Sequence, residues 1–169
     1  MREGKSRAMV DVRQAGIEDV PLILRFIKDI AEFEKLSDQV VTNERVLEQS
    51  LFGDRPAAGV IIAEIDGEPA GFAVYFFNFS TFIGRPGLYI EDIFVSEEKR
   101  GMGVGEAMMR YLAGLAVAER CERMEWAVLD WNPARSFYEN LGAKAMSDWV
   151  LYRLSGEELK RLGGSRAGR

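Results

Sequence analysis

The chain has 169 residues, of which 47% are hydrophobic, and its formal net charge of −5 gives a pI near 5.0. This length supports one core of ordinary size, so we expect a single domain over residues 1–169, with flexible tails at residues 1–9 and 163–169. The acidic balance argues against a general nucleic-acid binder, which would show a basic face, and fits a positively charged substrate better.

The chain contains no histidine, and Cys121 is its one cysteine. An intrachain disulfide is therefore impossible, and imidazole-based catalysis and the common zinc sites are excluded. Acid–base chemistry must then rest on Asp, Glu, Tyr, Lys or water, and we expect no metal site. No apolar run approaches the ~20 residues of a membrane-spanning helix, so we expect a cytoplasmic protein without membrane contact.

The first half of the chain predicts two helices followed by a β-hairpin. Residues 10–15 predict a strand, and apolar residues recur at helical spacing after Gly16. A second helix is expected after Thr42, which we expect to be its cap. Residues 59–79 read as two β-branched and aromatic runs, joined at Asp66-Gly67, which is a strong hairpin signal.

The second half alternates strands and helices. In order, it predicts a strand at 87–95, a long helix from Gly103, a strand at 124–130, a short helix at 133–141 stopped by Gly142, a strand at 149–154 and a terminal helix from Ser155. Antiparallel hairpins thus precede a strand–helix–strand crossover. This order predicts one α/β sheet, antiparallel in its first half and parallel where strands 87–95 and 124–130 flank the long helix.

Two adjacent acids, Glu91 and Asp92, interrupt the strand-like run YIEDIFV. Consecutive side chains of a regular strand point to opposite faces, so one of the two should face the packed side of the sheet. An ionised carboxylate is costly there. Either the strand is irregular at this point, or an opening that uses negative charge lies beside it.

A glycine-rich loop, KRGMGVG, stands between this strand and the long helix, with glycines at 101, 103 and 105. Such glycines let backbone N–H groups converge on an anion at a helix N-terminus, and Arg100 adds a full positive charge. The pattern predicts a phosphate or pyrophosphate ligand. The chain lacks GxxxxGK[ST], and Glu106 stands where a dinucleotide GxGxxG motif needs its last glycine, which argues against both of those motifs.

The loop Arg100–Gly105 resembles the R-x-x-G-x-G/A acyl-CoA pyrophosphate loop of the GNAT N-acetyltransferase superfamily, and the element order matches that fold across residues 10–155. Residues 132–143, NPARSFYENLGA, resemble a later family segment, although Asn132 and Tyr138 stand six steps apart where the family commonly has seven. The runs IKDIAEFE, YIEDIFV and LDWN are similar to the diamine acetyltransferase branch, which acts on polyamines and lysine-like thioether amines.

The resemblance implies acetyl-CoA as co-substrate and a GNAT-like mixed central sheet with a splayed parallel pair flanked by helices. In that fold the fourth strand carries a bulge, which the resemblance puts at Glu91-Asp92, so that both acids reach the opening. The fourth strand also parts from the fifth, and the pantetheine arm bonds to its backbone in the gap. The implied coenzyme-binding residues are Ile93, Phe94, Val95, Arg100, Gly101, Met102, Gly103, Val104, Gly105, Glu106 and Asn132.

The resemblance also implies the catalytic roles. A lysine-like amine has a pKa near 10.4, so roughly one molecule in a thousand is neutral at physiological pH, a handicap of about 4 kcal/mol. Glu91 would be the base that removes the proton, through water, and Asp92 would attract the cationic acceptor. Phe33 and Glu34 match a pair that lines the acceptor site. Tyr138 matches the tyrosine that protonates the leaving thiolate.

Three alternatives remain open on the sequence. In the first, the acceptor is a small cationic amine, which is either a polyamine or a lysine-like compound. In the second, the acceptor is an amine of a protein or peptide. In the third, the chain is a non-catalytic CoA-binding module. The loop NFSTFIGRPG has Arg85 where the polyamine enzymes would have an acid, which argues against polyamines. The resemblance also implies a homodimer.

Overall fold

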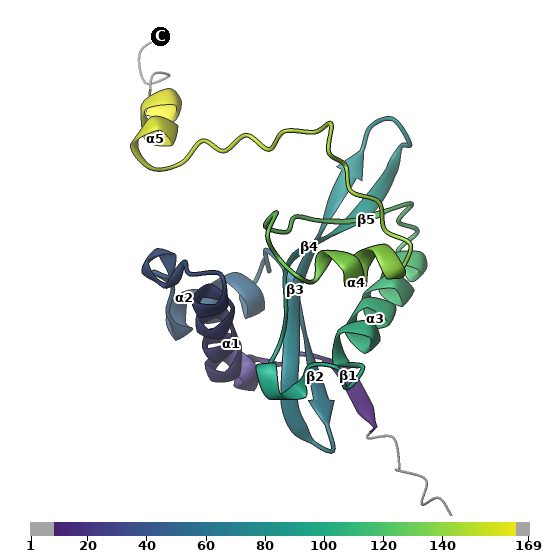
Figure 1. Cartoon of the computed structure of the whole chain (residues 1–169). Helices are drawn as coiled ribbons and strands as arrows, with labels where there is room; N and C mark the ends of the chain where they lie inside the picture. The colour runs from purple at the N-terminus through teal and green to yellow at the C-terminus, as the bar shows by residue number, and fades with distance from the viewer. Residues whose placement is uncertain (1–8, 165–169) are drawn as a thin grey trace, which may run out of the picture. The chain divides into compact units, whose positions relative to one another are not determined.

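The structure, a computed structural model, describes residues 9–164 and divides into two compact units after Ala127 (Figure 1). The first unit holds the sheet and its covering helices, and the second holds helices α4 and α5. Most of the predicted flexible tails lies outside the described residues, while residues 163 and 164 belong to α5. Whether the chain behaves as a single domain stays a prediction.

The first unit is built on a five-stranded mixed sheet with the strand order β1-β2-β3-β4-β5. The strands are β1 (Val10–Gln14), β2 (Gly59–Ile65), β3 (Glu68–Ser80), β4 (Arg85–Val95) and β5 (Met124–Trp126). The first four strands pair antiparallel, and β4 pairs parallel with β5. This architecture confirms the predicted α/β fold class, with an antiparallel first half and a parallel pair around the long helix.

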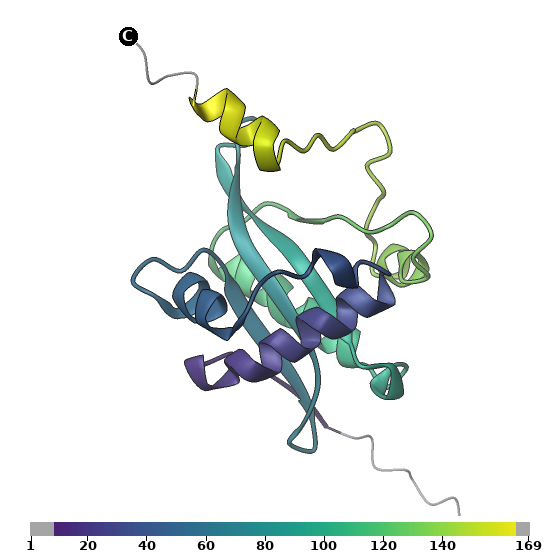
Figure 2. The same ribbon diagram turned by 90° about the vertical axis from the view of Figure 1, so that its left-hand side faces the viewer.

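The helices of the first unit cover the two faces of this sheet; they are α1 (Val20–Phe33), α2 (Glu44–Phe52) and α3 (Val104–Ala118). The second unit contains α4 (Arg135–Asn140) and α5 (Gly156–Gly164), and one-turn 3-10 helices lie at Ile17–Asp19, Ser37–Gln39 and Glu97–Lys99. Figures 1 and 2 show α1 and α2 on one face of the sheet and α3 on the opposite face. Among residues 9–164, no helix is long and apolar enough to cross a membrane.

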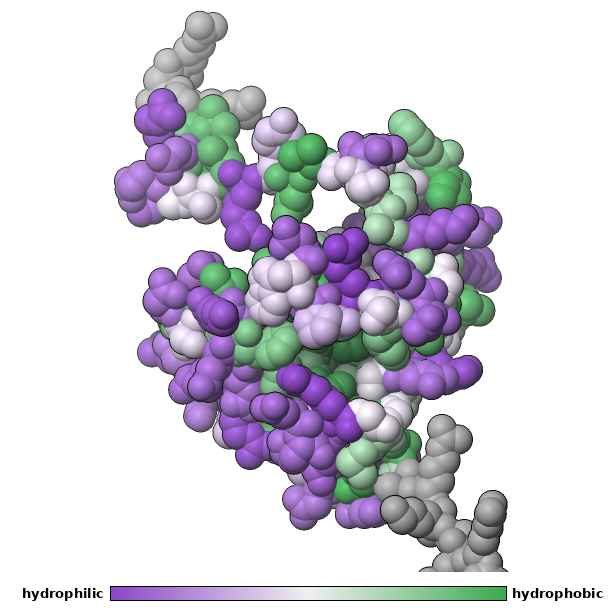
Figure 3. Space-filling view, viewed as in Figure 1, coloured by the Kyte–Doolittle hydropathy of each residue, from purple (hydrophilic) through white to green (hydrophobic). Residues whose placement is uncertain are grey.

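Helix α1 is held on the sheet by one apolar stripe. Ile23 and Phe26 are fully buried, and the Phe26 ring stacks on Phe72 of β3 with 5.3 Å between ring centroids. Phe94 of β4 lies against the same ring, at 6.2 Å. On the face of the first unit seen in Figure 3, hydrophilic side chains gather over α1. Burial of the stripe therefore fixes where α1 ends relative to β4, which matters for the site below.

The hairpin between β2 and β3 turns at Asp66 and Gly67, as predicted. Both residues have positive φ, 52° and 82°, as a two-residue type I′ turn requires. Asp66 tolerates this left-handed conformation better than most residues, and Gly67 adopts it without strain because it has no side chain.

Three sequence-based predictions were wrong in detail. The cap of α2 is Asn43, whose side-chain oxygen accepts from the Val46 N–H at 3.1 Å, so Thr42 lies one residue before it. The predicted strand 124–130 ends at Trp126, because β4 changes register at the acid pair and offers no further partner. Residues 149–154 form no strand, since among the described residues they have no neighbouring strand to pair with.

Candidate active site

Strand β4 carries a bulge at the acid pair, as predicted. Its ladder with β3 joins Asp92 to Val74 and Ile90 to Tyr75, so Glu91 is an extra residue with no partner opposite it. A bulge breaks the alternation of side chains and bends the strand. Glu91 is consequently exposed, whereas Asp92 is partly buried beside it.

Strands β4 and β5 part at the same point. Their last paired residues are Ile90 and Trp126, while β4 continues to Val95. Within the described residues, no strand pairs with the last part of β4 on this side. The bulge and the end of the parallel ladder together create a free strand edge next to the acid pair.

The direction of the main-chain groups along this free edge follows from the β3–β4 ladder. The Ser96 N–H donates to the Ala70 carbonyl at 2.9 Å, which makes this a hydrogen-bonded pair. Because hydrogen-bonded and open pairs alternate in an antiparallel ladder, Phe94 bonds toward β3, whereas Ile93 and Val95 turn their N–H and C=O groups to the free edge. Two of the three predicted backbone partners thus point to the opening, and Phe94 contributes its ring instead.

Asp92 lies in an electrostatic environment that favours its neutral form. Burial, then the charge of Glu91 and then that of Glu34, raise its pKa to about 6. Glu34 follows the last residue of α1, and burial also raises the pKa of its own carboxyl. Three predicted site residues from two separate elements therefore influence one another, although their positions in the sequence are far apart.

The glycine loop has the conformation that an anion-binding loop needs. Gly101 and Gly103 have positive φ, 75° and 87°, and a Cβ at either position would meet nothing within 4 Å. Gly103 is the N-cap of α3, so the first N–H groups of this 15-residue helix have no acceptor inside it. These open, unshielded N–H groups fit a diphosphate in chemistry. At the surface, Glu106 pairs with Arg110 at 2.8 Å.

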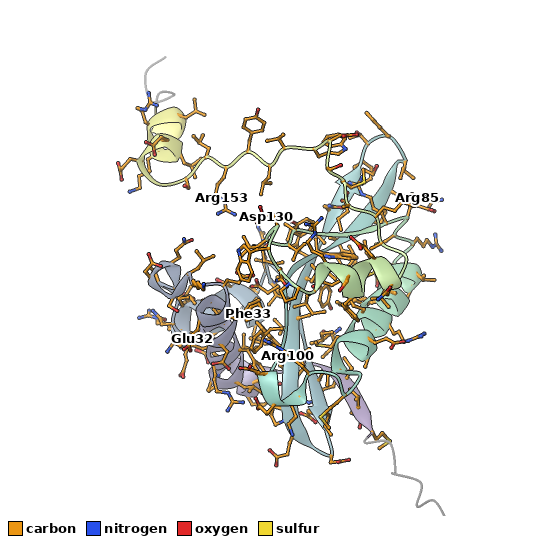
Figure 4. The ribbon with its side chains drawn as sticks, in the orientation of Figure 1. Glu32, Phe33, Arg85, Arg100, Asp130 and Arg153 are labelled. Carbon is orange, nitrogen blue, oxygen red and sulfur yellow. The ribbon has the colours of Figure 1, made fainter. Side chains whose placement is uncertain are left out.

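Arg100 turns from this loop toward the sheet. Its guanidinium carbon lies 4.7 Å from the centroid of the Phe33 ring and 5.9 Å from that of Phe94. Its Nε–H donates to the Val95 carbonyl at 3.2 Å. Figure 4 shows Phe33 at the end of α1 and Arg100 side by side, while Arg85 lies apart from both on the β3–β4 hairpin. This contact was not predicted, because no sequence periodicity links the end of α1 to the glycine loop.

The second unit contains the two remaining predicted site residues. Asn132 uses its side-chain oxygen to accept from the Ala134 N–H at 2.9 Å, which shapes the turn before α4. Tyr138 lies in α4, is partly buried, and its ring lies 5.3 Å from that of Phe137. The predicted helix ends as expected at Gly142, whose φ is 92°.

Residues 25–143 match the acetyltransferase (GNAT) family. The chain belongs to this family. It is 39% identical to a thialysine N-epsilon-acetyltransferase from Bos taurus, over 93% of this chain and 99% of that protein. It is 32% identical to an L-ornithine N5-acetyltransferase from Arabidopsis thaliana, over 89% of this chain and 86% of that protein. These relatives agree with the predicted diamine branch, and the chain is an acyl-transferring enzyme.

Solved structures confirm the GNAT fold. An integron cassette protein from the mobile metagenome of V. cholerae superposes with a TM-score of 0.76 at 28% sequence identity, over 91% of this chain and 97% of that chain. This chain and that protein therefore share one fold.

Proposed function

We propose that this acetyltransferase transfers the acetyl group of acetyl-CoA to the side-chain amine of a small lysine-like acceptor by direct attack. The observation that carries the proposal is the bulge at Glu91, which brings two carboxyl groups to the free edge of β4 next to Ile93 and Val95. Acetyl-CoA supplies the activated thioester. The open N–H groups of Gly101 to Glu106 support binding of its diphosphate there, and the free edge supports binding of its pantetheine arm.

The acid pair would remove the proton that keeps the amine unreactive. The family resemblance implies Glu91 as the base, acting through water. Burial and neighbouring charges raise the pKa of Asp92 to about 6, close to a neutral working pH, which suits this carboxyl to accept a proton within the pair. We therefore propose that the pair acts as a unit, with the ionisation of Asp92 setting the acid side of the pH profile.

Tyr138 would protonate the departing thiolate of CoA. A phenol suits this role because its reference pKa, near 10, keeps it protonated at neutral pH, so that it has a proton to donate as charge develops on the departing sulfur. Replacement of Tyr138 by Phe keeps the ring that contacts Phe137 and removes only the hydroxyl. We expect Tyr138→Phe to lose about 10²-fold or more in kcat while acetyl-CoA binding is retained.

The acceptor class rests on the relatives and on the charge of the site. The named acceptors of the two relatives, thialysine and ornithine, both have a primary amine at the end of a side chain. Glu34, Glu91 and Asp92 give the site the negative charge that such a cation needs. Arg85, in the loop where an acid would support polyamines, lies apart from Phe33 and Arg100 (Figure 4).

The test is a turnover screen in which free thiol is measured with acetyl-CoA and thialysine, lysine, ornithine, spermidine or putrescine. We expect release of CoA thiol with the amino acids and slower release with the polyamines. Turnover on peptide amines but on none of these compounds would favour a protein acceptor. If the wild-type chain binds acetyl-CoA but transfers to no amine, and Tyr138→Phe changes nothing, the chain is a CoA-binding module.

We also propose that the enzyme is a cytoplasmic homodimer, in keeping with the family resemblance. Sedimentation of the purified chain tests its mass, and a monomer at micromolar concentration would contradict the proposed assembly.

A further inference from the structure

We propose that Arg100 holds its guanidinium against the ring of Phe33, a residue that the family resemblance puts at the acceptor site, until a coenzyme diphosphate draws the guanidinium away. The inference rests on the proposed function, because it takes the glycine loop as the diphosphate site. It assigns Arg100 a second position, and it predicts that coenzyme and acceptor bind in a coupled manner.

The first support is the position of the Arg100 side chain. Its guanidinium carbon lies within 6 Å of two ring centroids, Phe33 at 4.7 Å and Phe94 at 5.9 Å, which is the range of a cation–π interaction. These two rings come from the end of α1 and from β4, and the Phe94 ring also contacts Phe26 in the core. The aromatic pair is thus anchored, and a positive charge already lies against it.

The second support is the hydrogen bond to Val95. Arg100 donates through Nε to a carbonyl that faces the free edge of β4. This carbonyl is one of the main-chain groups at the edge to which the pantetheine arm would bind. The arm and the Arg100 side chain therefore share one acceptor atom, and binding of the arm weakens the hold of Val95 on Arg100.

The third support is the alternative that is available to Arg100. Arg100 directly precedes Gly101, so its long side chain can also reach a diphosphate held on the loop. A planar guanidinium bonds phosphate oxygens in pairs, and such charge-assisted bonds are roughly twice as strong as neutral ones. A diphosphate would therefore outcompete one carbonyl and the aromatic rings.

The site that Arg100 leaves is suited to a cation. Glu34 follows Phe33 directly, and its charge reaches Asp92. An ammonium that replaces the guanidinium would gain the Phe33 ring on one side and carboxylates nearby. We expect an acceptor to bind better after the coenzyme, since the coenzyme removes the competing cation. The energy of one exposed cation–π contact corresponds to about a two- to fivefold change in affinity.

The experiment measures CoA binding by calorimetry in wild type, Phe33→Leu, Arg100→Gln and the double variant. Leucine keeps an apolar side chain at the end of α1 but cannot hold the guanidinium. We expect Phe33→Leu to bind CoA about two- to fivefold more tightly, because Arg100 is released in advance. Arg100→Gln binds CoA more weakly, and in its background Phe33→Leu has no effect.

A second readout separates the cation site from a structural role. With acetyl-CoA and thialysine, Phe33→Leu should raise the KM for thialysine while kcat changes little. Phe77→Leu, an exposed aromatic on the β3–β4 hairpin, and Arg85→Gln are matched controls that should change neither CoA affinity nor KM. Circular dichroism and melting temperature confirm that each variant is folded.

The outcomes distinguish the two proposals. If wild type takes up no CoA, the proposed function fails. If wild type binds CoA and transfers acetyl groups, but Phe33→Leu has the same or weaker CoA affinity, the proposed function stands and the exchange of Arg100 is refuted.

Discussion

Replacement of Asp92 by Asn should stabilise the protein at neutral and alkaline pH. The pKa of Asp92 is raised from its ordinary value of 3.8 to about 6, first by burial and then by the charges of Glu91 and Glu34. At 1.36 kcal/mol per pKa unit, an ionised Asp92 costs the folded state up to about 3 kcal/mol. Asn has nearly the same shape and no charge, so the variant avoids this cost.

The sign of the pH dependence follows from the raised pKa. Above pH 6 the carboxyl is ionised in both the folded and the unfolded chain, and the full cost is present. As the pH falls from 6 toward 3.8, the folded chain takes up the proton first, and the cost disappears. The advantage of Asp92→Asn in free energy of unfolding should therefore be largest near pH 8 and vanish near pH 4.

Urea unfolding of wild type and Asp92→Asn at pH 8, 6 and 4 measures this difference directly. Asp38→Asn, which changes an exposed aspartate, is the control and should show little change at any of these pH values. The reasoning is refuted if Asp92→Asn is less stable than wild type at pH 8, or if the gain is the same at all three values. A stabilised but inactive variant would mark Asp92 as a residue kept for function at the expense of stability.

Three further outcomes test other parts of the structure. Glu34→Gln removes a charge that raises the pKa of Asp92, so the acid limb of the pH profile of kcat/KM should move to lower pH. Asp38→Gln, the control, should leave this limb in place. Gly103→Ala puts a residue with a side chain at a backbone φ of 87°, which such residues rarely adopt. The variant should bind CoA more weakly and lose about 1 kcal/mol or more of unfolding free energy. Gly114→Ala, inside α3, is the control. Asp19→Asn should destabilise the fold by about 3 kcal/mol. The reason is that Asp19 is 7% exposed and its carboxylate accepts hydrogen bonds from both terminal nitrogens of Arg13, at 2.7 and 2.9 Å. An unchanged midpoint of urea unfolding would contradict this prediction.

The sequence predicted those parts of the fold that depend on local signals. Helix α1 shows its apolar stripe, the Asp66-Gly67 turn needs two positive φ angles, and the loop before α3 needs glycine at 101 and 103. Two adjacent acids cannot both avoid the packed face of a regular strand, which predicted either an irregular strand or an opening beside it, and the family resemblance predicted that the irregularity is a bulge. Each of these features is decided within a few residues.

The features that the sequence did not predict depend on partners elsewhere in the chain. Residues 149–154 have strand-like composition, yet β-structure requires a neighbouring strand, and composition does not say whether one is present. The length of β5 likewise depends on where β4 changes register, at Glu91. The extent of a strand is a property of the sheet and not of its own residues.

The division of work inside the acid pair is the clearest case of this dependence. The residue types of Glu91 and Asp92 are nearly equivalent, and only the register of the β3–β4 ladder makes one exposed and the other partly buried. Burial then gives Asp92 a pKa near 6, and the charge of Glu34 adds to it because the packing of Phe26 fixes α1 over β4. Loss of the bulge would therefore change which of the two carboxyls is buried, even though both residues remained in place.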